Sequence, residues 1–259
     1  MYHGKPAWFE LTTAPGQLAA AGTFYGKVLG WDLADAGMPG MTYHLASHGG
    51  DMVAGMMEAT TQMPPGWLIH FDVDDVDAAT ALVTGRGGKV LHPPTDIPGT
   101  GRFAVVSDPQ GAAFGLLQPT PMDPQPPAGS GAWNQRKEGH GNWTELMSTD
   151  PDAALDFYAK LLGWTLSQTM DMGDQGTYRI FAWNGTQIGG IMGLGHAPQS
   201  RWLPYFGVNG VAAAVDRVTG SGGTLIHGPQ EVPGPAFVAA LRDPQGADFA
   251  LVGPLEVTA

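Results

Sequence analysis

The chain has 259 residues, no cysteine, and a formal net charge of −12 from 24 acidic and 12 basic residues. The lack of cysteine excludes a disulfide framework, a thiolate metal site and a cysteine nucleophile, and the negative charge disfavours nucleic acid because it repels the phosphate backbone. The length and the 43% hydrophobic content suit two domains with separate cores, and because no signal peptide or membrane span is visible we expect a cytoplasmic protein without a membrane partner.

Two segments of the first half return in the second half in the same order. The sequence FYGKVLGWDL at 24–33 is repeated as FYAKLLGWTL at 157–166, and SDPQGAAFGLLQP at 107–119 is repeated as RDPQGADFALVGP at 242–254. The copies are much farther apart than the repeats of a solenoid, so each copy should be a whole domain. The tandem repeat therefore predicts an internal pseudo-dimer within one chain.

The domain boundaries follow from composition. The segment 120–139 is rich in proline, glycine and polar residues and has no periodic apolar face, which is typical of a linker. We therefore predict a first domain at 1–119, a linker at 120–139 and a second domain at 140–259.

Apolar periodicity predicts the same order of elements twice within each copy. In the first copy we expect a strand at 7–13, a helix at 16–30, strands at 31–36, 41–49 and 51–58, then a strand at 67–73, a helix at 74–88 and strands at 89–96, 102–108 and 112–118. Gly30 should end the first helix. In the second copy Asp150 and Pro151 provide an N-cap and a first-turn proline for the corresponding helix. Each half of each copy is thus one βαβββ module.

This module order, together with the FY.K.LGW and DP.G..F patterns, resembles the vicinal oxygen chelate superfamily of glyoxalase I, bleomycin-resistance proteins and extradiol dioxygenases. Trp8-Phe9-Glu10-Leu11 and Trp143-Thr144-Glu145-Leu146 are similar to the tandem-domain, glyoxalase-like branch. The resemblance implies an α+β fold of two tandem glyoxalase-like domains. Each domain would pair two βαβββ modules into a curled mixed sheet whose concave cup holds a ligand.

Alternation along the strand at 67–73 agrees with that arrangement. Trp67, Ile69, Phe71 and Val73 should face the helix, whereas Leu68, His70 and Asp72 should face the cup. In DPQG, the Asp-Pro pair opens a turn and the glycine provides a positive φ. We therefore interpret this motif as a fold signature.

The resemblance also implies metal ligands at four strand positions of each copy, where this sequence departs from the pattern. The matching positions are Trp8, Gly55, Leu68 and Gly115 in the first copy and Trp143, Gly190, Leu203 and Ala250 in the second. None of these side chains suits a divalent metal. The remaining metal candidates are Glu10 and His70, one pleat away, and Glu58 if the fourth strand is shifted. We therefore expect no cofactor with the usual ligand set.

The candidate catalytic residues are Glu10, Glu145 and His70. An inward carboxylate is costly unless it is paired or its pKa is raised, so Glu10 and Glu145 could each act as a general base beside a carbonyl group. Alternatively, they accept hydrogen bonds from Tyr43 and Tyr178. Glu10 and His70 could also bind each other or a water molecule.

Aromatic side chains with polar tips suggest cups for a small planar or carbonyl-containing molecule. The predicted ligand-binding residues are Trp8, Tyr43, Asp72, Arg102, Trp143, Tyr178 and Tyr205. Arg102 would hold a ligand carboxylate at the rim.

Two functions are therefore open. One is metal-free binding of a small organic molecule, as in bleomycin-resistance proteins. The other is a metal-dependent lyase, isomerase or dioxygenase that uses Glu10 and His70. A scaffold function ranks third, because it would not require polar groups in the cups.

Overall fold

A computed structural model describes residues 4–38, 40–59, 65–121, 130–195, 197–234 and 236–257. The chain packs into two compact units. Unit 1 comprises Met1–Ala7, Ile69–Ala128 and Thr144–Leu203, and unit 2 comprises Trp8–Leu68, Gly129–Trp143 and Pro204–Ala259.

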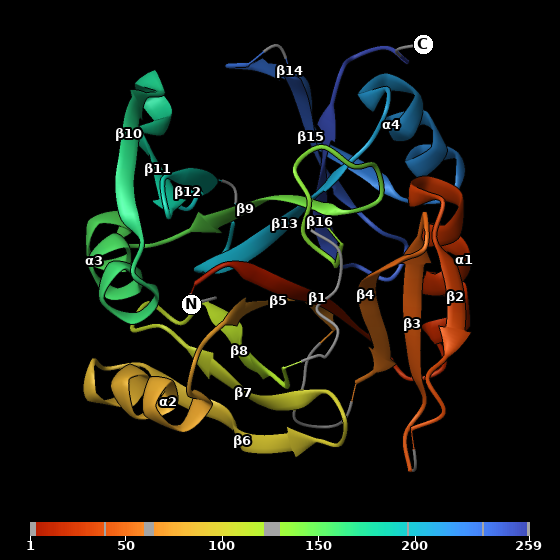
Figure 1. The fold of residues 1–259 in the computed structure, drawn as a ribbon. Coiled ribbons are helices and arrows are strands. Elements are labelled where there is room, and N and C mark those ends of the chain that lie inside the picture. The colour runs from red at the N-terminus through yellow and green to blue at the C-terminus, as the bar shows by residue number, and fades with distance from the viewer. Residues whose placement is uncertain are drawn as a thin grey trace. The chain divides into compact units, whose positions relative to one another are not determined.

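Every predicted βαβββ module is present (Figure 1). The first copy contains β1 (Pro6–Thr13), α1 (Leu18–Leu29), β2 (Asp32–Asp35), β3 (Tyr43–His48), β4 (Asp51–Glu58), β5 (Gly66–Asp72), α2 (Val76–Gly85), β6 (Lys89–Ile97), β7 (Gly101–Ser107) and β8 (Ala113–Pro119). The second copy contains β9 (Gly141–Met147), α3 (Pro151–Leu162), β10 (Thr165–Asp171), the short 3-10 helix η1 (Gly173–Gln175), β11 (Thr177–Trp183), β12 (Thr186–Met192), β13 (Arg201–Gly207), α4 (Val211–Gly220), β14 (Thr224–Val232), β15 (Ala236–Arg242) and β16 (Asp248–Gly253).

The strands form two eight-stranded mixed sheets, one for each sequence copy. Their strand orders are β2-β3-β4-β1-β5-β8-β7-β6 and β10-β11-β12-β9-β13-β16-β15-β14. Within a module, the first and last strands pair in parallel, as in β1 with β4, and the other pairs are antiparallel. The predicted fold class is therefore confirmed.

Local signals in the sequence explain the helix ends. Asp150 accepts a hydrogen bond from the backbone N–H of Ala153, and Pro151 follows it in the first turn of α3. Gly30 and Gly163 end α1 and α3 with φ angles of 68° and 70°, which favour glycine. The predicted start of α3 and end of α1 are thus confirmed.

Each compact unit contains one module from each copy. Unit 2 combines the modules of α1 and α4, which contact each other, and unit 1 combines those of α2 and α3, which also do so. The predicted boundaries at 1–119, 120–139 and 140–259 follow the repeat in the sequence, whereas the units follow packing. Those boundaries therefore stay a prediction, and residues 122–129 of the predicted linker lie outside the described residues.

The repeated motifs meet in buried hydrogen-bonded chains. In unit 2 the indole N–H of Trp67 donates to the Tyr25 hydroxyl at 2.9 Å, and this hydroxyl donates to Asp243 at 2.9 Å. The FY motif of one copy is thus bonded to the DPQG motif of the other. The bond from Trp67 to α1 also confirms that this tryptophan faces the helix.

Unit 1 repeats the arrangement. Trp202 donates to the Tyr158 hydroxyl at 3.0 Å, and Tyr158 donates to Asp108 at 3.1 Å. Both tyrosines have no exposed surface. Burial raises the pKa of Tyr25 and of Tyr158, so each hydroxyl keeps its proton and remains a donor.

The turns explain why these acceptors are aspartates. Asp108 also accepts the backbone N–H of Ala112 at 2.8 Å, and Gly111 turns the chain with a φ of 91°. Burial raises the pKa of Asp108, while bonds from the turn and from Tyr158 act in the opposite direction. The turn prediction for DPQG is confirmed, and the motif additionally binds a tyrosine.

The described end of the predicted linker is packed into unit 2. Trp133 is 8% exposed and stacks on Phe9 with ring centroids 6.4 Å apart. Trp31 donates to the Gly139 carbonyl at 2.8 Å, and Asp51 accepts from Lys137 at 2.6 Å. Part of the segment 130–139 is therefore packed against the core of unit 2, although its composition is polar.

None of the helices in the ranges described above has both the length and the apolar character needed to cross a bilayer.

Replacing Tyr25 or Tyr158 with Phe should lower the free energy of unfolding by about 1.5–3 kcal/mol each, because a Trp donor and a buried Asp acceptor lose their shared partner. Urea denaturation measures this loss. Tyr178→Phe is the matched control: that tyrosine is half-buried, so water can replace its bond, and the loss should be smaller. Equal losses at all three positions would contradict the stabilising role of the buried chains.

Candidate functional site

In unit 2, strand β1 presents a tryptophan and a glutamate that share one tyrosine. The indole N–H of Trp8 donates to the Tyr43 hydroxyl at 2.9 Å, and this hydroxyl donates to Oε2 of Glu10 at 3.1 Å. Trp8 and Glu10 are two residues apart on the strand, so they share a face. Tyr43 reaches them across β4, where a β-carbon at Gly55 would collide with the tyrosine ring. Gly55 is therefore needed for this arrangement.

Unit 1 contains the equivalent pair from the second copy. The Tyr178 hydroxyl donates to Oε2 of Glu145 at 3.0 Å. A β-carbon at Gly190 would collide with the Tyr178 ring, as at Gly55. The predicted tyrosine hydrogen bonds to both glutamates are thus confirmed. Trp143, the counterpart of Trp8, lies half-buried in unit 2.

Burial raises the pKa of Tyr43, and the negative charge of Glu10 raises it further. The hydroxyl is therefore protonated at neutral pH and holds the carboxylate in place as a hydrogen-bond donor. Such a fixed carboxylate can bind a donor group or receive a proton.

His70 occupies a glycine-lined position on β5 in unit 1. Its side chain is 3% exposed, and it fills the space above Gly115, where a β-carbon would overlap the imidazole. In unit 2 the equivalent register pair is Tyr205 with Ala250, both buried. The two copies therefore differ in ring chemistry at this position.

Asp72 lies two residues beyond His70 on the same face of β5. It is 8% exposed, and within the described residues its Oδ1 atom has no hydrogen-bond partner. Burial raises the pKa of Asp72 to about 7, although the positive charge of Lys5 lowers it. This carboxyl can therefore exchange a proton near neutral pH.

The guanidinium group of Arg102 is bound by two carboxylates of unit 1. It donates to both oxygens of Asp77, at 2.7 and 3.0 Å, and to Asp96 at 2.8 Å. A ligand carboxylate at this rim position would have to compete with two aspartates that already balance the guanidinium charge. The structure thus gives Arg102 a clear structural role, and its role in ligand binding stays a prediction.

The strand register shows which side chains lie close enough together to bind one metal ion. Glu10 lies opposite Gly55, and His70 lies opposite Gly115, so each pair contains only one side chain with a ligand atom. The described residues contain no group of three or more His, Asp or Glu side chains that could hold an ion. The residues present therefore do not fit the usual four-ligand set.

Glu58 was a metal candidate only if β4 were aligned differently with β1, and the observed register of the two strands does not bring it to Glu10. It pairs with Thr13, three residues along from the pair of Glu10 and Gly55, which places its side chain on the opposite face. There it accepts the backbone N–H of Gly16 at 2.9 Å. Glu58 is thus bound to the chain segment before α1.

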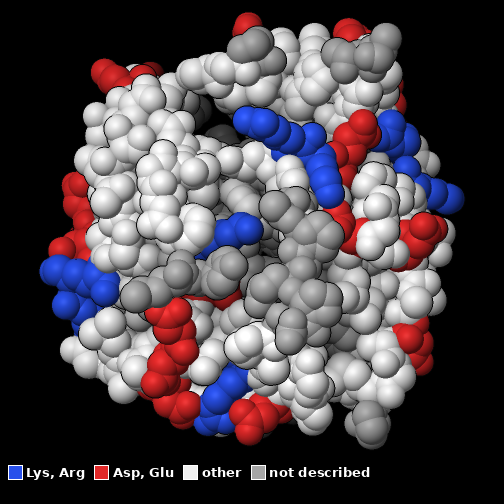
Figure 2. Space-filling model, viewed as in Figure 1, with Lys and Arg blue, Asp and Glu red and all other residues white. Residues whose placement is uncertain are grey.

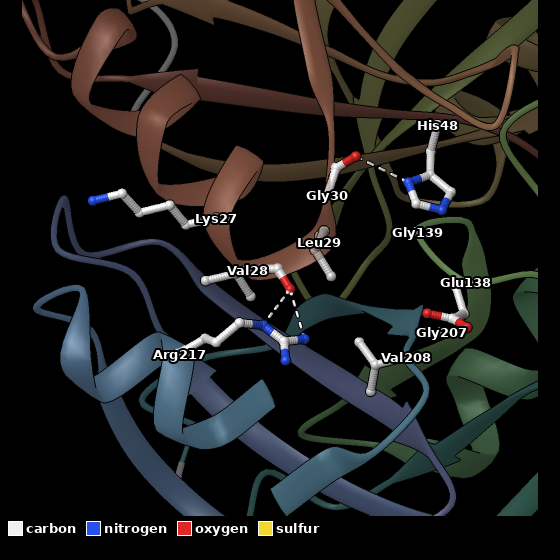
Figure 3. Close-up of a pocket in the computed structure, with 10 residues that line it drawn as sticks. All are labelled: Lys27, Val28, Leu29, Gly30, His48, Glu138, Gly139, Gly207, Val208 and Arg217. Carbon is white, nitrogen blue, oxygen red and sulfur yellow. Dashed lines mark hydrogen bonds between the residues drawn. The ribbon is translucent and has the colours of Figure 1, made fainter. Parts of the chain in front are cut away.

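A small cavity of about 210 Å³ opens on unit 2 between the end of α1, residues 138–139, β13 and α4. Arg217 points across it and donates to the Val28 carbonyl at 3.1 Å, and Nδ1 of His48 bonds the Gly30 carbonyl at 3.0 Å (Figure 3). Both groups satisfy carbonyls at the helix end. The residues that line the cavity come from five separate segments of the chain, so no local sequence signal predicts it.

Much of the face shown in Figure 2 consists of uncharged residues. This agrees with a charged fraction of only 14% over the whole chain.

The pKa of Asp72 predicts a pH-dependent stability. The folded chain keeps this proton between about pH 4 and pH 7, while the unfolded chain loses it, so stability falls as the pH rises through this window. Asp72→Asn should therefore stabilise the protein by on the order of 2–4 kcal/mol at about pH 8, with the difference disappearing below about pH 4.

Urea denaturation across that pH range checks this expectation. Asp216→Asn removes an exposed carboxylate of α4 and serves as the matched control, with little change expected at any pH. A pH-independent effect of Asp72→Asn would contradict the raised pKa.

Comparison with known proteins agrees with the geometry. Residues 10–116 and 141–251 match the profile of the glyoxalase/bleomycin resistance protein/dioxygenase superfamily. The chain is 34% identical to CFP32 of Mycobacterium tuberculosis, which carries a provisional name as a glyoxylase; the match covers 97% of this chain and 95% of CFP32. It is 32% identical to the anthracycline biosynthesis protein DnrV of Streptomyces peucetius, over 96% of this chain and 93% of DnrV.

Solved structures share the fold. The Mn(II)-bound glyoxalase of Novosphingobium aromaticivorans has a TM-score of 0.67 at 19% identity, covering 99% of this chain and 84% of its own. The 2,3-dioxygenase LapB of Pseudomonas sp. KL28 has a TM-score of 0.67 at 16% identity, covering 100% and 99%. With both repeats matched in order, the chain belongs to the glyoxalase/bleomycin resistance protein/dioxygenase superfamily.

Proposed function

We propose that the chain binds a small organic molecule with carbonyl or aromatic groups on the strand faces that carry Glu10 and Glu145. The observation that carries this proposal is the tyrosine–glutamate pair, which is built in both copies over a glycine. A half-buried carboxylate held in place by a tyrosine donor is the type of polar group that orients a ligand in an otherwise apolar site.

The chemistry of the pair suits a ligand that donates a hydrogen bond. A carboxylate accepts several hydrogen bonds at once, so Glu10 can bind a ligand hydroxyl while Tyr43 holds it. Trp8 offers an apolar ring on the same face. The related protein DnrV is named for anthracycline biosynthesis, which supports an oxygenated aromatic ligand as one option.

We propose that this binding does not use the usual metal set of the superfamily. Gly55 and Gly115 lie at the positions opposite Glu10 and His70, and glycine has no side-chain ligand atom. The tyrosine and imidazole rings fill the space above these glycines. No catalytic step is therefore assigned to a metal.

The alternative is a metal-dependent lyase, isomerase or dioxygenase with Glu10 and His70 as partial ligands. The names of similar proteins, a glyoxylase, a Mn(II)-bound glyoxalase and a 2,3-dioxygenase, favour it. A carboxylate and an imidazole are ligand types of many catalytic metal centres. This alternative requires ligand atoms beyond those two side chains.

Metal content separates the two functions. Protein purified without an affinity tag and equilibrated with Ni, Zn, Fe(II) or Mn should retain far less than one ion per chain after gel filtration, as measured by elemental mass spectrometry. Retention of one ion per chain that is lost in Glu10→Gln and in His70→Asn, but kept in Asp216→Asn, would establish the metal-dependent alternative.

Ligand binding tests the glutamates directly. The probe is 4-hydroxyacetophenone, which has an aromatic ring, a carbonyl group and a hydroxyl donor. Glu10→Gln should weaken its binding by roughly tenfold, because a hydrogen bond to a charged acceptor is replaced by a weaker neutral one. Ligand-observed NMR measures the affinity, and Glu145→Gln reports the second copy. Unchanged binding in both variants would exclude the glutamates as ligand contacts.

A further inference from the structure

Three rings line up on the sheet face that carries His70 in unit 1. The His70 and Phe103 ring centroids are 6.4 Å apart, and Phe103 stacks on His92 at 5.1 Å with an angle of 12° between the planes. These residues come from β5, β7 and β6, so the rings form a strip across the half-sheet. We name His70, Phe103 and His92 the aromatic strip.

Strand β8 makes this strip possible. It runs between β5 and β7, with Gly115 opposite His70 and Leu117 opposite Phe103. Gly115 adds no side chain, so the His70 ring can lie over β8 toward Phe103. A larger residue at this position would separate the two rings.

The outer ring is held in a fixed orientation. The Thr95 hydroxyl donates to the Pro93 carbonyl at 2.9 Å, so it accepts from Nε2 of His92 at 3.1 Å. His92 is thereby kept nearly parallel to Phe103. Phe103 and His92 are half-buried, which leaves part of each ring open to a ligand, whereas His70 is buried.

The second copy lacks the middle of the strip. By strand register the residues equivalent to His70, Phe103 and His92 are Tyr205, Val238 and His227. Valine at position 238 provides no ring between the other two. The aromatic strip is therefore a property of the first copy, and the chain itself offers a matched control.

We propose that the aromatic strip selects a planar aromatic ligand in unit 1, with Phe103 as the specificity-determining residue. This inference rests on the proposed function, and adds the ligand class and the unit that prefers it. An aromatic ligand gains from contact with rings already fixed in place, because stacked and edge-to-face contacts add to simple area burial. A saturated ligand of the same size gains burial alone.

The experiment compares 1-tetralone with 1-decalone, two bicyclic ketones with the same skeleton, of which only the first has an aromatic ring. In the full chain, Phe103→Leu should weaken 1-tetralone binding by about 3- to 10-fold and leave 1-decalone unchanged. Val238→Leu, the matched substitution in the second copy, should change neither affinity. Ligand-observed NMR titration measures both.

The outcomes separate the two proposals. If both ketones bind the unmodified chain equally and Phe103→Leu affects them alike, the strip is ordinary packing and this inference fails, while the proposed binding function stands. If neither ketone nor 4-hydroxyacetophenone binds, both proposals fail. Urea denaturation verifies that Phe103→Leu folds; if it does not, His92→Leu, at a half-buried position, should reduce the preference for 1-tetralone in the same direction.

Discussion

The buried hydrogen bond from tyrosine to the DPQG aspartate is the constraint on which both packing units depend. Tyr25 binds Asp243, and Tyr158 binds Asp108, so each bond joins a helix of one sequence copy to a turn of the other. Each unit therefore needs one module from each copy. The two sequence copies and the two compact units therefore divide the same chain in different ways.

Much of the fold could be predicted because its signals are local. The N-cap at Asp150, the stop at Gly30 and the alternation from Trp67 to Val73 each depend on a few neighbouring residues. The pairing of Tyr25 with Asp243 joins residues more than two hundred positions apart, and no local pattern specifies it. Residues 130–139 illustrate the same limit, since Trp133 is buried by distant partners within a polar segment.

The types of residue in the candidate site could be predicted from the sequence, but most of the contacts between them could not. Glu10 and Glu145 were predicted to point inward because each lies one pleat away from a ligand position that the resemblance implies, and their tyrosine donors were predicted because an inward carboxylate needs a partner. The bonds of Arg102 to Asp77 and Asp96 could not be predicted from its position in the sequence. Phe103 and His92 were missed because each is unremarkable alone; inward alternation on neighbouring strands was the signal that could have linked them.

Gly55 and Gly190, which lie beneath the rings of Tyr43 and Tyr178, limit how this site could change during evolution. A metal-binding side chain at position 55 would occupy the space of the Tyr43 ring, and the same holds for position 190 and Tyr178. Such a substitution would be tolerated only after the tyrosine had become smaller, which would first release Glu10 or Glu145 from its donor. A route from the present pair to a metal centre therefore passes through an intermediate sequence that has neither arrangement intact.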